Sequence, residues 1–437
     1  MASSVGVVSL GCSKNRVDTE QVLGLLTARG YTIQADPAQA EIILINTCGF
    51  IGPAKEESID AILEMAEHKR TGKCRLLLVT GCLAQRYGSD LLRDMPEIDG
   101  LLGVGEYERI FELIDAAALG ARPRYDGRTE GFLESDRVLS TPPCTAYIKI
   151  GDGCDNRCTY CAIPLIRGGY RSRPLDAIVA EVTRLAARGV QEFVLVAQDS
   201  TRYASDWGQP RGLEALLRAV CAVPGVVWVR PLYCDPERVD AALLDAMHAL
   251  PQVCDYMDMP IQHIHPELLR AMGRRGTSSH IREMVTAAHS RGMTLRTSLI
   301  VGFPGETDAQ FQALMDFVAE ARFHRLGAFA YSPEEDTPAA LLPGQVPDAV
   351  KRQRLDTLMA LQQRISLAHN QARVGQVCRV LVEGARPDGR RLGRTEREAP
   401  EVDGRIIFRP RQPHAIGDFV SVRLQRAASY DMMGVEV

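Results

Sequence analysis

The sequence predicts an α/β protein in three parts: an N-terminal open parallel α/β sheet, a central partial (β/α)6 barrel and a small all-β barrel at the C-terminus. Two series of short apolar runs that alternate with helical patterns predict the first two parts. Beyond residue 373, short β-like runs separated by Gly, Pro and Asp predict the third. We therefore divide the chain into residues 1–119, a linker over 120–143, residues 144–372 and residues 373–437.

In the N-terminal part, residues 5–10, 42–45 and 76–79 are rich in Val, Ile and Leu, as expected for buried parallel strands, and residues 101–104 are expected to form another. Helix-like apolar spacing covers residues 16–29 and 54–68. In such a sheet the strands end at a common edge, so the loops that follow them should meet. Residues 120–143 mix Gly, Pro and charge without periodicity, which is typical of a linker.

The central part contains six predicted strands, which suggests an open or partial barrel. They are residues 147–150, 193–197, 226–230, 256–259, 294–301 and 327–331. The helical patterns between them cover residues 175–188, 213–222, 239–250, 281–291 and 309–321. A long amphipathic segment over 350–373 then leads to the last part, with strands expected at 378–382, 405–408, 419–424 and 433–437.

Composition excludes several classes of protein. A chain of 437 residues that is 46% hydrophobic and 24% charged is typical of a folded protein, not a disordered one. The net charge of −4 lacks the basic excess common in nucleic-acid-binding proteins. The first ten residues do not resemble a secretory signal, and no apolar run approaches the roughly 18 residues that span a bilayer. We therefore expect a cytoplasmic protein without a membrane association.

The strongest chemical signal is a C-x3-C-x2-C loop formed by Cys154, Cys158 and Cys161, directly after the strand expected at 147–150. Twelve cysteines are too sparse for a disulfide framework, and grouped thiols in a reducing compartment are more often metal ligands. Three thiolates can hold three irons of a 4Fe-4S cluster and leave the fourth iron open to another ligand. The alternative is a structural zinc site, for which Cys144 is the nearest fourth ligand.

A second signal is a dispersed set of three cysteines, each just past the end of an N-terminal strand: Cys12, Cys48 and Cys82. Since those strand ends should converge, the three thiols suggest a second cluster. Each has an adjacent glycine, which allows a close approach of the backbone. The alternative is that these thiols are buried as small apolar side chains.

The Cys154 loop resembles the signature of the radical S-adenosylmethionine superfamily, and the whole chain resembles the methylthiotransferase family. The matches include SLGCSKNR at 9–16, NTCGF at 46–50 and TGCLAQ at 80–85, with a C-terminal module that looks like a TRAM domain. The ribosomal branch is the closest within that family, on CAIP at 161–164, RGGYRSR at 167–173, DMPIQH at 258–263, YSPEE at 331–335 and EAPEVDG at 398–404. Ser13 stands where that branch usually has proline, and GDGCD at 151–155 replaces the commoner SDGCN. Neither departure changes a ligand thiol.

The resemblance implies two 4Fe-4S clusters and two roles for S-adenosylmethionine. One molecule donates a methyl group to sulfur at the cluster of Cys12, Cys48 and Cys82. The other is cleaved reductively at the Cys154, Cys158 and Cys161 cluster, and the 5′-deoxyadenosyl radical takes a hydrogen from the β-carbon of an aspartate. The implied substrate is protein twelve of the small ribosomal subunit, and the implied electron donor is of low potential, such as flavodoxin or ferredoxin.

The same resemblance implies cofactor contacts from four further residues, although backbone turning alone could explain the glycine: Tyr160, Gln198, Gly302 and Phe303. No catalytic residue beyond the cluster ligands is assigned. The other six cysteines have no mutual pattern, and Glu334 and Glu335 are expected to be solvated loop residues.

Two other functions are open at this point. One is a transfer RNA methylthiotransferase that acts on a modified adenosine. The last 64 residues, 374–437, favour a protein partner over RNA, because they contain eleven arginines, nine acidic residues and no lysine, a net charge of only +2. The other is a non-catalytic iron–sulfur or zinc scaffold that recruits a ribosomal partner and turns over no cofactor.

Overall fold

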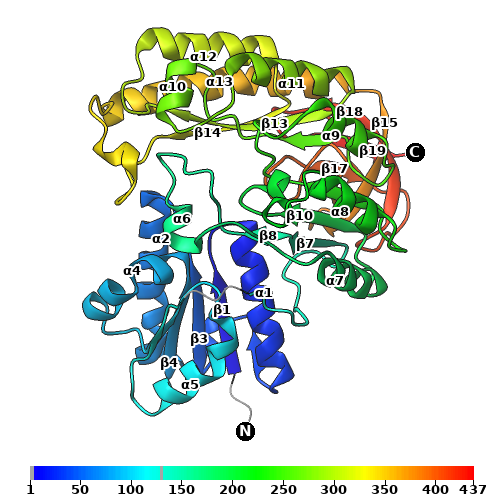
Figure 1. Ribbon diagram of the computed structural model, residues 1–437. Coiled ribbons are helices and arrows are strands. Elements are labelled where there is room, and N and C mark those ends of the chain that lie inside the picture. Colours follow the sequence, from blue (N-terminus) through cyan, green and yellow to red (C-terminus); the bar gives the residue numbers. More distant parts are fainter. Residues whose placement is uncertain (1–3, 128–130) are drawn as a thin grey trace. The chain divides into compact units, whose positions relative to one another are not determined.

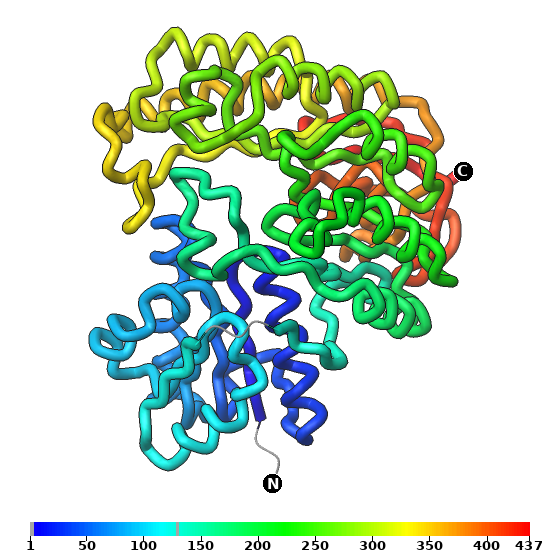
Figure 2. Tube along the Cα trace, viewed as in Figure 1, coloured from blue at the N-terminus to red at the C-terminus, as the bar shows by residue number. Residues whose placement is uncertain are grey.

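The computed structural model describes residues 4–127 and 131–437, so part of the predicted linker, 128–130, lies outside the described residues together with 1–3. The chain divides into two compact units. We call residues 1–140, 152–173 and 332–340 unit 1, and residues 141–151, 174–331 and 341–437 unit 2. Figure 2 traces the chain through both.

Unit 1 is built on a six-stranded parallel sheet of order β2-β1-β3-β4-β5-β6, which confirms the predicted open parallel sheet. Its strands are β1 (Ser4–Ser9), β2 (Thr32–Gln34), β3 (Ile42–Thr47), β4 (Leu76–Gly81), β5 (Gly100–Leu102) and β6 (Arg124–Tyr125). Its main helices are α1 (Ser13–Ala28), α2 (Gly52–Ala66), α3 (His68–Thr71), α4 (Cys82–Asp94) and α5 (Ile110–Ala118).

Both faces of this sheet are covered, which explains why its central strands are apolar throughout. Alternate residues of β3 enter different core clusters: Ile43 and Ile45 belong to one, and Ile42 and Leu44 to the other. Figure 1 shows β1, β3 and β4 side by side among these helices. The later segment of unit 1 adds β8 (Gly151–Asp152), α6 (Ile163–Arg167) and β9 (Arg171–Ser172).

Unit 2 contains the six strands predicted for the partial barrel, in two three-stranded parallel sheets of order β11-β10-β7 and β12-β13-β14. A parallel bridge connects Val229 of β11 to Val253, in the segment that precedes β12. The strands are β7 (Thr145–Lys149), β10 (Glu192–Val196), β11 (Trp228–Pro231), β12 (Tyr256–Asp258), β13 (Thr294–Val301) and β14 (Arg325–Ala330). Helices follow most strands: α7 (Leu175–Ala187), α8 (Gly212–Cys221), α9 (Ala241–His248), α10 (Pro266–Ala271), α11 (Ser278–Ser290), α12 (Asp308–Ala321) and α13 (Asp348–Ala372).

The C-terminal part of unit 2 is a closed five-stranded barrel of order β15-β16-β17-β19-β18. It comprises β15 (Val377–Ala385), β16 (Arg391–Arg394), β17 (Ile406–Arg409), β18 (Phe419–Ala427) and β19 (Met432–Glu436). The sequence predicts four of these strands and misses β16, because RLGR has neither a β-branched run nor apolar alternation. Among the described residues, no helix is both long and apolar enough to cross a membrane.

Three histidines that stack in unit 2 predict a dependence of its stability on pH. The rings of His324 and His369 lie 4.2 Å apart, and His289 lies 5.6 Å from His324. His324 Nδ1 accepts a hydrogen bond from the Leu295 backbone at 3.1 Å. Burial, reinforced by the two neighbouring histidines, lowers the pKa of His324 to about 2.

Because the folded pKa of His324 lies below the value of about 6.5 in an unfolded chain, the unfolded state binds the proton first. The contribution of neutral His324 to the free energy of unfolding is therefore fully present above pH 6.5. It falls as the pH is lowered towards 2, by at most about 1.4 kcal/mol per pH unit. Urea unfolding at pH 7.5 and 5.5, followed by fluorescence of Trp207 and Trp228 in unit 2, measures this change in the free energy of unfolding. His324→Phe should flatten the dependence of the unfolding free energy on pH.

Candidate cluster-binding site

Three cysteines, which we call the N-terminal trio, lie together where the central strands of unit 1 end. Cys12 precedes α1 after β1, Cys48 follows β3, and Cys82 is the first residue of α4, directly after β4. These three strands are neighbours in the sheet. A Cβ atom on Gly11 would lie only 3.3 Å from Cys48 Sγ, so the first two loops are in contact. The structure thus brings the predicted trio together.

The glycines beside the trio allow its loops to pack closely. Gly81 has φ 95°, and a Cβ atom there would lie 2.2 Å from Asn46 Oδ1 and 2.5 Å from the Thr47 carbonyl oxygen. At Gly49 a Cβ atom would lie 2.8 Å from the backbone of Leu83. Larger residues would therefore separate the loops that carry the three thiols.

The thiols of the trio have different electrostatic surroundings. Burial raises the pKa of Cys48 to about 12, and burial also raises the pKa of Cys82 although Arg167 opposes it. At Cys12 the loss of surrounding water disfavours the thiolate. The charges of Lys14 and Arg167 and hydrogen bonds from backbone N–H groups outweigh this effect and lower the pKa of Cys12. Because metal ligands are thiolates, a metal bound at this site would displace protons from Cys48 and Cys82.

The other three predicted ligands lie on one loop of unit 1, residues 154–161, which we call the cluster loop. Cys154, Cys158 and Cys161 are all half-buried. The loop is preceded by Gly153, where a Cβ atom would lie 2.0 Å from the Gly169 carbonyl oxygen, so only glycine fits. Backbone hydrogen bonds then hold it, including Cys154 N to Gly168 O at 3.0 Å.

Each set supplies three thiols, the number that holds three irons of a 4Fe-4S cluster and leaves the fourth iron open. A four-iron cluster takes one thiolate per iron, so its ligands stand farther apart than the ligands of one ion. Among the described residues, no group of three His, Cys, Asp or Glu side chains could hold a single metal ion. In the cluster loop the Asn156 N–H donates to Cys154 Sγ at 3.5 Å, as expected around a cluster thiolate. Cys144, the fourth ligand in the zinc alternative, is buried in unit 2 and contacts the Val382 carbonyl oxygen at 3.9 Å.

The four residues proposed to contact S-adenosylmethionine belong to different units. Tyr160 is half-buried in the cluster loop, in unit 1. In unit 2, Gln198 is half-buried two residues after β10, and Gly302 and Phe303 follow β13. Phe303 is fully buried and packs edge-to-face on Tyr331, with ring centroids 5.3 Å apart. The Gly302–Phe303 turn therefore offers a cofactor its backbone.

A buried carboxylate fixes the Gly302 turn. Glu306 accepts a hydrogen bond from the Gly302 backbone N–H and contacts His263 Nε2 at 3.3 Å and Arg354 Nη1 at 3.1 Å. Gly302 has φ 71°, and a Cβ atom there would lie 2.3 Å from Lys351 Cγ. The conformation of this turn is thus set before any cofactor binds.

Glu334 corrects one expectation from the sequence. It is 1% exposed, not solvated, and one carboxylate oxygen accepts from the Gly52 backbone N–H at 2.8 Å. The other oxygen pairs with Lys55 at 3.0 Å and Arg86 at 3.1 Å. Because Arg86 also donates to the Gly49 carbonyl oxygen, Glu334 supports the loop that carries Cys48. Glu335 is exposed as expected.

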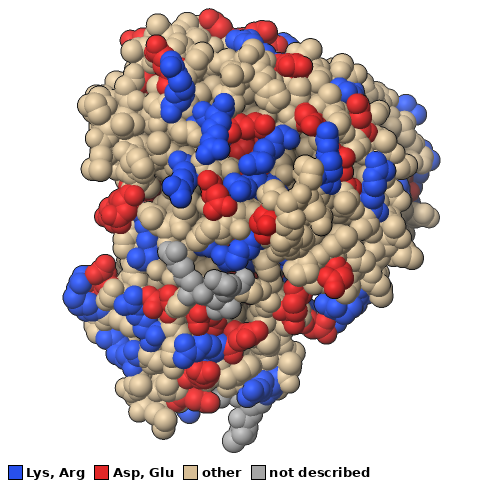
Figure 3. All heavy atoms as spheres, viewed as in Figure 1, with Lys and Arg blue, Asp and Glu red and all other residues tan. Residues whose placement is uncertain are grey.

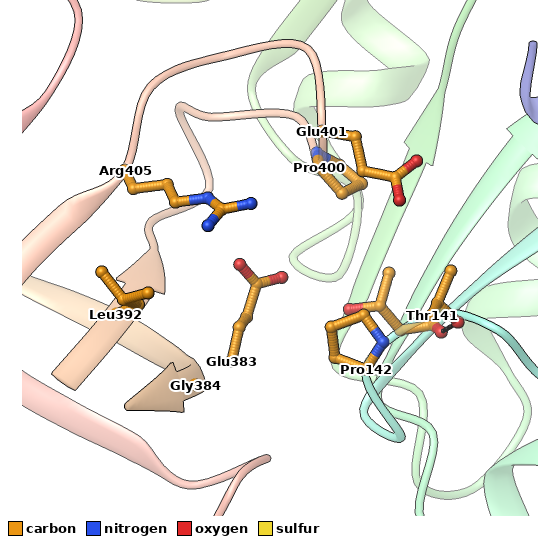
Figure 4. A pocket seen from close by; sticks show the side chains of 9 residues that line it. Thr141, Pro142, Glu383, Gly384, Leu392, Pro400, Glu401 and Arg405 are labelled. Atoms are coloured by element: carbon orange, nitrogen blue, oxygen red, sulfur yellow. Dashed lines mark hydrogen bonds between the residues drawn. The ribbon is translucent and has the colours of Figure 1, made fainter. Parts of the chain in front are cut away.

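A cavity of about 110 Å³ lies in unit 2 between the C-terminal barrel and the segment leading into β7. Figure 4 shows Glu383 and Arg405 facing one another across it. Glu401 is the second carboxylate that lines the cavity, and it accepts a hydrogen bond from Tyr147 at 3.1 Å. Glu383 accepts a hydrogen bond from Arg394 at 2.9 Å. The cavity contains none of the predicted site residues. The hydrogen bond between Glu401 and Tyr147 connects the barrel module to β7, whereas Glu383 pairs within the barrel.

Sequence reasoning assigned no role to two residues that contact the trio, Asn15 and Arg167. Asn15 is fully buried beside all three loops, and Arg167 donates to Cys82 Sγ at 3.7 Å. Both lie in stretches quoted for the family resemblance. No signal in the sequence marks them, because an arginine at the end of an apolar segment such as IPLIR is ordinarily exposed.

Three family models match the chain along its length. They are an uncharacterized protein family, UPF0004, over residues 4–103, the radical SAM superfamily over 148–318, and the TRAM domain over 374–437. The chain is 47% identical over 99% of both chains to the ribosomal protein uS12 methylthiotransferase RimO of Desulforamulus reducens. It is 48% identical to the protein of that name in Desulforudis audaxviator, over 99% of this chain and 96% of the relative.

Solved structures resemble the fold. The radical S-adenosylmethionine methyltransferase TsrM of Kitasatospora setae, solved with cobalamin and a [4Fe-4S] cluster, aligns with a TM-score of 0.55 and 17% identity. That alignment covers 78% of this chain and 74% of TsrM. The cobalamin-dependent radical enzyme OxsB aligns with a TM-score of 0.50 and 12% identity, over 83% of this chain and 56% of OxsB. The similarity supports the fold of the chain.

Proposed function

Because the chain belongs to the ribosomal protein uS12 methylthiotransferase family, we propose that it attaches a methylthio group to the β-carbon of an aspartate in uS12. S-adenosylmethionine serves both as methyl donor and as radical source. The observation that carries this proposal is the presence in unit 1 of two separate sets of three cysteines, the N-terminal trio and the cluster loop.

Each set of thiols has its own task in this proposal. The trio holds one 4Fe-4S cluster and the cluster loop holds another. When bound, the cluster-loop iron–sulfur group supplies the electron that cleaves S-adenosylmethionine, and the trio's group supplies the place where the methylthio sulfur is held. The protein's own contribution is to fix the thiols: glycines 11, 49, 81 and 153 bring the loops close, and buried polar side chains keep them there.

We propose that four residues hold S-adenosylmethionine: Tyr160, Gln198, Gly302 and Phe303. Glu306 already holds the Gly302 turn through a hydrogen bond, which reduces the entropy lost when the cofactor binds. A low-potential donor such as flavodoxin or ferredoxin supplies electrons, and the ribosomal substrate places the reaction in the cytoplasm. We propose residues 1–119, 144–372 and 373–437 as the functional modules, with the 120–143 linker between the first two.

The charge of the chain supports a protein substrate over transfer RNA. On the face drawn in Figure 3, basic and acidic side chains are interspersed without a continuous basic field. Arg394 of the C-terminal barrel and Arg373, which follows α13, pair with buried carboxylates, so these arginines are not available to phosphates.

The proposal is tested by anaerobic reconstitution of the full chain with iron and sulfide, followed by reduction with S-adenosylmethionine and uS12. We expect 5′-deoxyadenosine and a methylthio mass gain on one aspartate, both measured by mass spectrometry. Release of 5′-deoxyadenosine with modification of transfer RNA instead would exclude uS12 as the substrate. No cofactor cleavage in the iron-loaded protein would favour a scaffold.

A further inference from the structure

Asn15 connects all three loops of the N-terminal trio. Its Nδ2 donates to the carbonyl oxygens of Leu10 at 3.2 Å and Thr47 at 2.9 Å, which lie beside the first and second thiols of the trio. Its Oδ1 accepts from the third thiol, Cys82, at 3.5 Å. Since Asn15 is fully buried, one amide side chain fixes the spacing of the three loops.

Arg167 reaches the same place from the other set of ligands. Its side chain is 1% exposed. Nη1 binds both carboxylate oxygens of Asp152, at 3.1 and 3.0 Å. Nη2 donates to Asn15 Oδ1 at 2.7 Å, to Asp18 Oδ2 at 3.1 Å and to Cys82 Sγ at 3.7 Å. A single guanidinium thus contacts a cluster ligand and the amide that holds its neighbours.

Arg167 is the last residue of α6, the helix that follows the cluster loop after Cys161. Ala162 and Ile166, on the same segment, pack in one buried cluster with Cys82 and Val104. The chain that leaves one set of ligands therefore lies directly against a ligand of the other set. Apolar packing and the guanidinium act at the same contact.

The chemistry of the donor gives this contact a role beyond packing. The metal-free Cys82 thiol donates its proton to Asn15, but a metal-bound thiolate has no proton to donate. Arg167 keeps its N–H groups at all relevant pH values, so it remains a donor to that sulfur. Hydrogen bonds and positive charge at a cluster sulfur stabilise the reduced cluster and raise its reduction potential.

We propose that Asn15 and Arg167 are positioning residues for the cluster of the N-terminal trio. The hydrogen bond from Arg167 to Cys82 raises the reduction potential of that cluster. This inference rests on the proposed function, because it requires the trio to hold a cluster. A purely structural arginine would leave the potential unchanged. Arg173 provides the comparison: it is 3% exposed in the same segment of unit 1 and pairs with Glu134.

The test uses the full chain with Cys154, Cys158 and Cys161 replaced by alanine, so that all bound iron belongs to the trio. Iron and sulfide are counted per chain, and the midpoint potential is measured by a redox titration followed by electron paramagnetic resonance. Arg167→Met should shift the potential to a more negative value. Arg167→Lys keeps the charge but not the planar fork, so it should give a smaller shift in the same direction. Arg173→Met should give none.

An unchanged potential in Arg167→Met or Arg167→Lys, at full iron content, would overturn the inference and leave the trio's cluster in place. If the triple-alanine parent binds no iron, the ligand assignment in the proposed function fails, and the inference fails with it. Arg167→Lys is sufficient by itself if Arg167→Met does not fold, because it retains a cation beside Asp18 and Asp152.

Discussion

Cys158→Ala abolishes the cleavage of S-adenosylmethionine, whereas Cys48→Ala keeps the cleavage and loses the transfer of sulfur: this is the result we expect for the two sets of ligands. Cys158 shares one short loop with Cys154 and Cys161, so its loss leaves two thiolates there. Cys48 lies instead beside Gly11 at the ends of the N-terminal strands. Anaerobic assays with uS12, which quantify 5′-deoxyadenosine and methylthio product by mass spectrometry, distinguish the two variants.

Cys74→Ala is the matched control, because Cys74 is a buried thiol of unit 1 that contacts the Leu76 carbonyl oxygen at 3.4 Å and lies outside both sets. It should keep both products. If Cys48→Ala still adds methylthio groups at full iron content, the trio is not the sulfur site. If Cys48→Ala also loses cleavage while the cluster loop retains its iron, the two sets do not act independently.

The convergence of the trio was predictable because it depends on topology. Apolar runs identify the strands, parallel strands end at one edge, and each cysteine follows the end of a run. The same logic identifies the six strands of the central part, since buried parallel strands are continuously apolar. The pattern does not predict short edge strands such as Thr32–Gln34 and Arg124–Tyr125, because half-exposed runs of two or three residues carry no periodic signal.

The polar side chains that support the ligands were not predictable from local pattern. Glu334 lies on a loop, where a carboxylate is ordinarily solvated, yet Lys55 and Arg86 come from distant positions to pair with it. Arg167 likewise is buried because it pairs with Asp18 and Asp152, which are 149 and 15 residues away in the sequence. Burial of a charge is decided by partners in space, and a single sequence does not place those partners.

Glu192→Gln should lower the free energy of unfolding of unit 2 by about 3–5 kcal/mol, the cost of breaking a buried ion pair. Glu192 begins β10 and is fully buried. It accepts from Arg230 Nε and Arg394 Nη1, each at 3.2 Å, and from Thr145 Oγ1 at 3.1 Å. Burial raises its pKa, but the two guanidinium groups outweigh this and hold the pKa below its ordinary value.

The position of Arg394 explains why this one change should affect the attachment of the barrel. Arg394 lies on β16 of the C-terminal barrel, whereas Glu192 and Arg230 lie on the central strands β10 and β11. Neutralising Glu192 leaves Arg230 buried without its carboxylate partner, while Arg394 retains Glu383. The contact between barrel and central sheet therefore loses its charge balance, although its apolar packing remains.

Tryptophan fluorescence measures this effect selectively, because both tryptophans of the chain belong to unit 2 and Trp228 packs edge-to-face on Phe419 of the barrel, with ring centroids 4.9 Å apart. Glu320→Gln, which breaks an exposed pair with Arg282 in the same unit, should cost only about 0–1 kcal/mol.

The double variant Glu192→Gln/Arg394→Met should lose less free energy of unfolding than the two single variants together, since it removes both members of the pair. Strict additivity in that cycle would show that Glu192 and Arg394 do not stabilise one another.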